Sequence, residues 1–135
     1  MIKLIKASGL QIALADDNRL IFKPPLKPVE PEYRRLADMV DYLQDSQAKF
    51  AKDVVYTMYR GLAKKDGLRY DLTVLEPGTI GKERVKTIGH YHQGNFPEVY
   101  EVIFGEAWYL LQQRRENSSP LKVVKLIKVK PGQKV

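Results

Sequence analysis

The sequence predicts an all-β sandwich or barrel built as one domain. Most of the chain after residue 54 consists of short runs rich in β-branched and aromatic residues, which favour strands. Clusters of Gly, Pro, Asn and Asp separate these runs at regular intervals, as is typical of sandwiches and barrels. A length of 135 residues suits one domain with a buried core.

The first part of the chain is predicted to form a hairpin, a connector and a helix. Residues 10–15 and 19–22 have the pattern of short strands, joined by the turn-forming Asp16-Asp17-Asn18. Four prolines between residues 23 and 31 favour an extended connector. Residues 33–44 carry apolar side chains at helical spacing, so we expect an α-helix there. These side chains are Leu36, Met39, Val40 and Leu43.

The remaining elements are predicted to be strands joined by turns. We expect strands at residues 54–60, 68–76, 84–88, 97–104, 107–113 and 121–129. Turn residues separate them at positions 65–67, 77–78, 105–106 and 117–120. We expect residues 1–50 to pack on a barrel formed by residues 51–135.

Composition excludes several kinds of site. The chain has no cysteine, so disulfides, thiolate nucleophiles and sulfur-ligated zinc are impossible, and His and carboxylates remain as metal ligands. The net charge of +7 is spread along the chain, which argues against nucleic-acid binding and favours small anions such as sugar phosphates. No signal peptide or membrane-spanning apolar run is evident, so we expect a cytoplasmic protein without membrane contact.

The two histidines of the chain are the strongest chemical signal. His90 and His92 lie two residues apart and Glu98 follows them. Residues i and i+2 of a strand point to one face, and a neighbouring strand can bring Glu98 beside them. Two histidines and one carboxylate form a facial set for a divalent ion. The alternative is a surface pair, or ordinary strand histidines.

These residues carry a resemblance to a known family. Gly89, His90, His92, Glu98 and Gly105 are similar to the first cupin motif. The chain more specifically resembles the cupin-type glucose-6-phosphate isomerases, best known from archaea, over roughly residues 10–132. The motifs lie at residues 34–39, 54–56, 72–78, 80–83, 87–92, 97–102 and 109–112. The resemblance implies a cupin double-stranded β-helix, or jelly-roll barrel, with an N-terminal helix.

The resemblance also implies a metal site and a reaction. His90, His92 and Glu98 would hold a divalent ion (Fe, Mn, Zn or Ni), and Glu98 would also be catalytic. The substrate would be a sugar phosphate and the assembly a homodimer. Aldose–ketose interconversion needs a polarised carbonyl and a group that shuttles protons. An enediol route and a hydride shift both remain open.

Family substrate contacts map onto five residues of this chain. These are Tyr56, Thr73, Thr87, the backbone of Gly89, and Tyr100. Hydroxyl groups and a glycine N–H donate hydrogen bonds to phosphate without bulk. Without the resemblance, the better explanation is that the tyrosines are half-buried strand aromatics and the threonines ordinary strand residues.

The family pattern continues past the last residue of this sequence. Lys130-Pro131-Gly132 corresponds to the start of the second cupin motif, which supplies a fourth, histidine ligand and the closing strands. We therefore expect a barrel that is incomplete at its C-terminal end, with an unpaired edge beside residues 121–129. A shortened chain or gene fragment, a naturally truncated protein, and a partner that supplies strands by exchange are three explanations.

Two alternative functions follow from the same residues. The first is a non-catalytic or degenerate cupin that binds a sugar phosphate. The second is a cupin oxygenase that uses the same three ligands with Fe(II).

Overall fold

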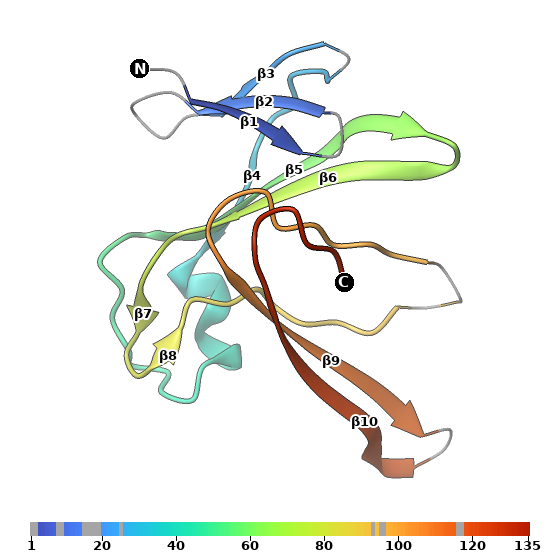
Figure 1. Cartoon of the computed structure of the whole chain (residues 1–135). Coiled ribbons are helices and arrows are strands. Elements are labelled where there is room, and N and C mark those ends of the chain that lie inside the picture. Colours follow the sequence, from blue (N-terminus) through green and yellow to red (C-terminus); the bar gives the residue numbers. More distant parts are fainter. Residues whose placement is uncertain are drawn as a thin grey trace. The chain divides into compact units, whose positions relative to one another are not determined.

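The structure is a computed structural model that describes residues 3–7, 10–14, 20–24, 26–92, 94, 97–115 and 118–135. Within these residues the regular structure is almost entirely β, which confirms the predicted all-β class (Figure 1). The strands are β1 Lys3–Ala7, β2 Leu10–Leu14, β3 Leu20–Phe22, β4 Glu32–Arg35, β5 Val54–Lys65, β6 Leu68–Leu75, β7 Thr79–Ile80, β8 Glu83–Arg84, β9 Ala107–Arg115 and β10 Ser118–Val129.

The chain divides into two compact units. Unit 1 contains Met1–Lys23 and Asn95–Val135, and unit 2 is Pro24–Gly94. Among the described residues, no helix is both long and apolar enough to cross a membrane. The one-domain organisation predicted from the sequence stays a prediction.

Unit 2 is built on the antiparallel sheet β4-β5-β6. A two-residue turn joins β5 and β6, where Lys65 pairs with Leu68. Both turn residues have positive φ, 52° at Asp66 and 79° at Gly67. This is the backbone of the tight hairpin turn that Asp-Gly favours, and it fixes the register of the two long strands.

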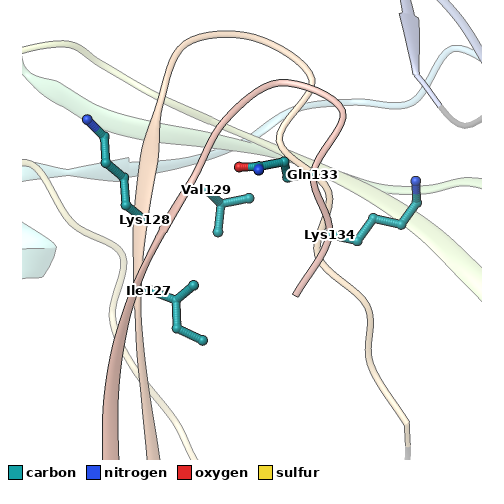
Figure 2. A pocket seen from close by; sticks show the side chains of 5 residues that line it. All are labelled: Ile127, Lys128, Val129, Gln133 and Lys134. Atoms are coloured by element: carbon teal, nitrogen blue, oxygen red, sulfur yellow. The ribbon is translucent and has the colours of Figure 1, made fainter.

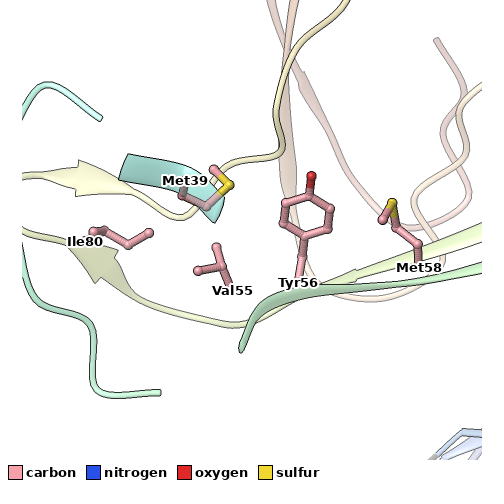
Figure 3. Close-up of a cluster of buried hydrophobic side chains, with 5 residues drawn as sticks. All are labelled: Met39, Val55, Tyr56, Met58 and Ile80. Carbon is pink, nitrogen blue, oxygen red and sulfur yellow. The ribbon is translucent and has the colours of Figure 1, made fainter. Parts of the chain in front are cut away.

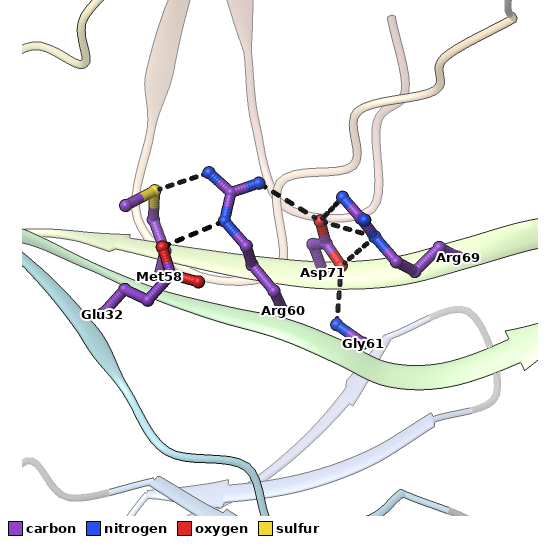
Figure 4. Close-up of polar contacts among 6 residues, drawn as sticks. All are labelled: Glu32, Met58, Arg60, Gly61, Arg69 and Asp71. Carbon is purple, nitrogen blue, oxygen red and sulfur yellow. Dashed lines mark hydrogen bonds and ion pairs between the residues drawn. The ribbon is translucent and has the colours of Figure 1, made fainter.

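A bulge interrupts the β5–β6 ladder and is closed by a carboxylate. The pairing shifts between Tyr59 and Ala63, and Gly61 takes a φ of 72° there. The Gly61 N–H donates to Asp71 Oδ1 at 2.8 Å. Arg69 Nη2 donates to Asp71 Oδ2 at 2.7 Å (Figure 4). A backbone donor left unpaired by the bulge thus regains a partner.

The core of unit 2 lies beside the beginning of β5. The buried side chains of this cluster are Met39, Val55, Tyr56, Met58 and Ile80 (Figure 3). Partly buried apolar side chains surround it: Leu36, Leu43, Ala48, Phe50, Val85 and Ile88. The core therefore joins the sheet to the segments on either side of it in sequence.

The predicted α-helix over residues 33–44 is wrong. The structure has strand β4 followed by a 3₁₀-helix, η1, Leu36–Tyr42. Pairing of β4 with β5 takes up the first predicted turn, with Tyr33 opposite Thr57. The Leu36 N–H then donates to the Asp53 carbonyl at 2.9 Å. A 3₁₀-helix repeats every three residues, so the same spacing buries Met39 without an α-helix.

One further predicted strand is shorter than expected, and another does not form. Of residues 84–88, only Arg84 lies in a strand, β8, which pairs with β7. Residues 97–104 form no regular strand; Glu101 makes a single bridge to Lys134. The Ile88 N–H donates to a side chain, the Tyr56 hydroxyl. Tyr100 exchanges backbone hydrogen bonds with Val135, which lies outside the named strands. The predicted strands at residues 54–60, 68–76, 107–113 and 121–129 are confirmed, the last starting earlier.

Unit 1 contains one three-stranded and one two-stranded sheet. β2 pairs with β3 as predicted for the N-terminal hairpin, and β1 adds a third strand. The predicted turn at Asp16-Asp17-Asn18 lies outside the described residues, as does Asn117. β9 and β10 form a long antiparallel ribbon in which Leu110 lies opposite Leu126.

Candidate metal and substrate site

The two histidines lie side by side in unit 2. They follow β8 in a segment without regular secondary structure, and both are exposed. Their ring centroids are 5.0 Å apart and the ring planes differ by 21°. A ring nitrogen binds a divalent ion at about 2.0–2.1 Å, so two imidazoles that share an ion must be close neighbours. The side chains of His90 and His92 meet this requirement without a strand ladder.

Packing and one hydrogen bond fix the chain just before the histidines. The side chains of Val85 and Ile88 pack against the core cluster. The Ile88 N–H donates to the Tyr56 hydroxyl at 3.4 Å. Figure 3 shows the Tyr56 ring standing out from β5 with its hydroxyl away from the strand. The histidine segment is thereby attached to the central strand of the sheet.

Predicted substrate residues gather around this attachment. Tyr56 lies opposite Leu75, and Met58 lies opposite Thr73. Because opposed residues share a face of an antiparallel pair, Tyr56 and Thr73 are diagonal neighbours on one face. Thr87 and Gly89 flank Ile88, and both are exposed. The structure therefore places Tyr56 and Thr73 on one face of the sheet, and Thr87 and Gly89 on either side of the residue whose amide bonds to Tyr56.

Gly89 leaves open space in front of its backbone. A Cβ built on Gly89 meets no described heavy atom within 4 Å, and its φ lies outside the left-handed range. Neither packing nor backbone conformation in unit 2 thus requires glycine here. The open space leaves room for a ligand to approach the main chain at this position.

Glu98 and Tyr100 lie together in unit 1. Partial burial, a hydrogen bond to Glu98 and the nearby Tyr109 together raise the pKa of the Tyr100 hydroxyl well above its usual value. The rings of Tyr100 and Tyr109 have centroids 5.1 Å apart and are tilted by 47°. Sequence reasoning missed Tyr109. No residue pattern marks it as a site residue; in the structure it is less exposed than Trp108 and Leu110, its neighbours on β9.

The backbone around Tyr100 is held by the last residues of the sequence. Tyr100 and Val135 exchange two hydrogen bonds, each 2.9 Å long. The Val102 N–H donates to the Gln133 carbonyl at 3.2 Å. Glu98 thus lies two residues before an antiparallel pairing whose partners are more than 30 residues apart in the sequence.

The predicted metal ligands divide between the two units. His90 and His92 belong to unit 2, whereas Glu98 belongs to unit 1. Within the parts of the chain that the structure describes, no three His, Asp or Glu side chains gather as a metal site. The three-ligand site and the identity of its ion stay predictions.

Unit 1 also contains a hollow. It is lined by Ile127, Lys128, Val129, Gln133 and Lys134 (Figure 2). Lys128 Nζ lies 2.9 Å from Glu106 Oε2, and Lys134 Nζ lies 3.5 Å from Glu101 Oε1. Both lysines are therefore already paired with carboxylates, which weakens their attraction for a further anion. None of the predicted site residues lines the hollow.

Comparison with known proteins gives the family of the chain. Residues 33–135 match the family described as glucose-6-phosphate isomerase (GPI). The glucose-6-phosphate isomerase of Thermococcus onnurineus (strain NA1) is 38% identical over 106 residues, covering 73% of this chain and 53% of the relative. The glucose-6-phosphate isomerases of Thermococcus litoralis and of Pyrococcus furiosus (strain ATCC 43587 / DSM 3638 / JCM 8422 / Vc1) are each 36% identical over 107 residues, with the same coverage.

The chain spans about half the length of these curated relatives. No solved structure matches it significantly. The family match covers most of the sequence, including η1, both histidines and Glu98. The strand-rich fold agrees with the cupin type of this family. The chain belongs to the cupin-type glucose-6-phosphate isomerase family.

Proposed function

We propose that the protein is a metal-dependent isomerase that interconverts glucose 6-phosphate and fructose 6-phosphate. The observation that carries this proposal is the close pair of histidine rings, which follows the segment that bonds to Tyr56 on β5. The named relatives are glucose-6-phosphate isomerases, which supports the same reaction. We propose further that the protein works in the cytoplasm as a homodimer.

Each group of residues has a task in the proposed reaction. The exposed hydroxyls of Thr73 and Thr87 and the Gly89 N–H donate hydrogen bonds to the phosphate. The net charge of +7 draws the anionic sugar towards the protein. Tyr100 bonds to Glu98 and so orients its carboxylate, which accepts a proton from one sugar carbon and returns it to the next.

The donor set also suits a divalent ion such as Mn(II) or Fe(II). His90 and His92 would supply two ring nitrogens, and Glu98 would supply a carboxylate. When bound, the ion polarises the carbonyl oxygen of the sugar and holds it in place.

The test compares His92→Ala with Lys82→Ala, an exposed control in the same unit. Each variant is supplied with Mn(II) and assayed for metal retention and for conversion of fructose 6-phosphate. We expect His92→Ala to lose both properties and the control to keep them. Unchanged metal content in His92→Ala would contradict the site.

Metal and sugar-phosphate binding without turnover in the wild-type chain would instead support a non-catalytic binder. Oxygen consumption coupled to an organic substrate would support the oxygenase.

A further inference from the structure

The Tyr56 hydroxyl contacts the backbone of the histidine segment. It accepts the Ile88 N–H at 3.4 Å, and only 3% of Tyr56 is exposed. A buried hydroxyl that already accepts a main-chain hydrogen bond is poorly placed to serve mainly as a contact for a soluble sugar phosphate. Its immediate effect is on the chain that it holds.

Ile88 is fixed in two ways. Its side chain packs on the cluster that contains Tyr56 and Met58, and its amide is bonded to the Tyr56 hydroxyl. His90 follows two residues later, and two residues span at most about 7 Å. A displacement of Ile88 would therefore act close to the backbone of His90. Gly94, which follows the pair, has a φ of 101° that favours glycine.

We propose that Tyr56 is a positioning residue for the histidine pair. It holds the Ile88 backbone so that the ring nitrogens of His90 and His92 reach one divalent cation together. This inference rests on the proposed metal-dependent function. It adds a role for Tyr56 that differs from substrate contact, because the hydroxyl acts through the main chain of another residue.

The experiment uses the full chain, Mn(II) alone, and the variants Tyr56→Phe and Tyr42→Phe. Tyr56→Phe keeps the buried ring and removes only the hydroxyl, whereas Tyr42 is 52% exposed and serves as the control. Loss of one neutral hydrogen bond corresponds to a change of about two- to tenfold. We expect Tyr56→Phe to weaken Mn(II) binding and to speed amide exchange at Ile88, each by that factor. Tyr42→Phe should change neither.

The outcomes separate this inference from the proposed function. If Tyr56→Phe keeps the Mn(II) affinity and the Ile88 exchange rate but raises KM for fructose 6-phosphate, Tyr56 is a substrate contact and the inference is wrong. If wild-type protein binds no Mn(II), the proposed function fails. In that case the exchange rate of the Ile88 amide still tests whether Tyr56 holds the Ile88 backbone. A faster rate in Tyr56→Phe supports this role, and an unchanged rate overturns it.

Discussion

Replacing Gly89 by alanine should separate ligand approach from folding. The new Cβ meets no described heavy atom within 4 Å, and the φ of Gly89 lies outside the left-handed range. Alanine also has fewer conformations than glycine in the unfolded chain. This lowers the entropy lost on folding and stabilises a compatible site by about 0.4–1 kcal/mol. We therefore expect Gly89→Ala to fold at least as stably as the wild type.

The same methyl group should weaken sugar-phosphate binding. In the proposed site the Gly89 N–H donates to the phosphate, and a Cβ would occupy the open space that the phosphate enters. A hydrogen bond to a charged group contributes about 1.5–3 kcal/mol. Its loss corresponds to a roughly 10- to 150-fold weaker affinity. Calorimetric titration with fructose 6-phosphate measures this change.

Gly81→Ala is the matched control. Gly81 has a φ of +58°, and its new Cβ would lie 3.0 Å from the Cβ of Ala48. The left-handed conformation costs alanine about 1–2 kcal/mol, so urea denaturation should show a loss of stability of about 1 kcal/mol after the entropy gain. Wild-type affinity in Gly89→Ala would refute contact between its N–H and the phosphate. A destabilised Gly89→Ala would refute the argument from open space.

Three further substitutions test the fold of unit 2. Met39 is fully buried, so Met39→Ala should lower the free energy of unfolding in urea by about 2–5 kcal/mol. Bonds to Lys86 and Gln44 lower the pKa of the Glu83 carboxyl. Its stabilising effect is therefore present above the pKa of an unfolded glutamate and lost as pH falls through the folded value. Glu83→Gln should remove this part of the acid dependence, measured as thermal midpoints against pH. Asp71→Asn weakens the acceptor of the Gly61 N–H. The Gly61 amide should therefore exchange its hydrogen faster, and the free energy of unfolding should fall by about 1 kcal/mol or less.

The long strands could be predicted because their signals are local. Alternating and β-branched residues mark β5 and β6, and the Asp66-Gly67 turn fixes their register. The error over residues 33–44 has a physical cause. Apolar side chains three residues apart satisfy both an α-helix and a 3₁₀-helix. Pairing of β4 with β5 then decides the outcome, and the local pattern contains no information about that partner.

The candidate site divides in the same way between local and non-local features. The spacing of His90 and His92 predicted neighbouring rings, which the structure has. The bond from the Ile88 amide to Tyr56 joins positions 32 residues apart and involves a main-chain donor. No residue pattern specifies such a bond. The packing of Tyr109 on Tyr100 likewise depends on how β9 meets a segment without regular structure.

The segment that carries Glu98 shows how composition can predict a strand but not its partner. Residues 97–104 contain the apolar and aromatic side chains of a strand, yet their described pairing is limited to residues 132–135. The chain reverses at Pro131 and Gly132, where Gly132 has a φ of 84°. This reversal lets Val135 bond to both backbone groups of Tyr100. The position of the Glu98 carboxylate in unit 1 is therefore set by residues far along the sequence, because Tyr100 is fixed by them and bonds to Glu98.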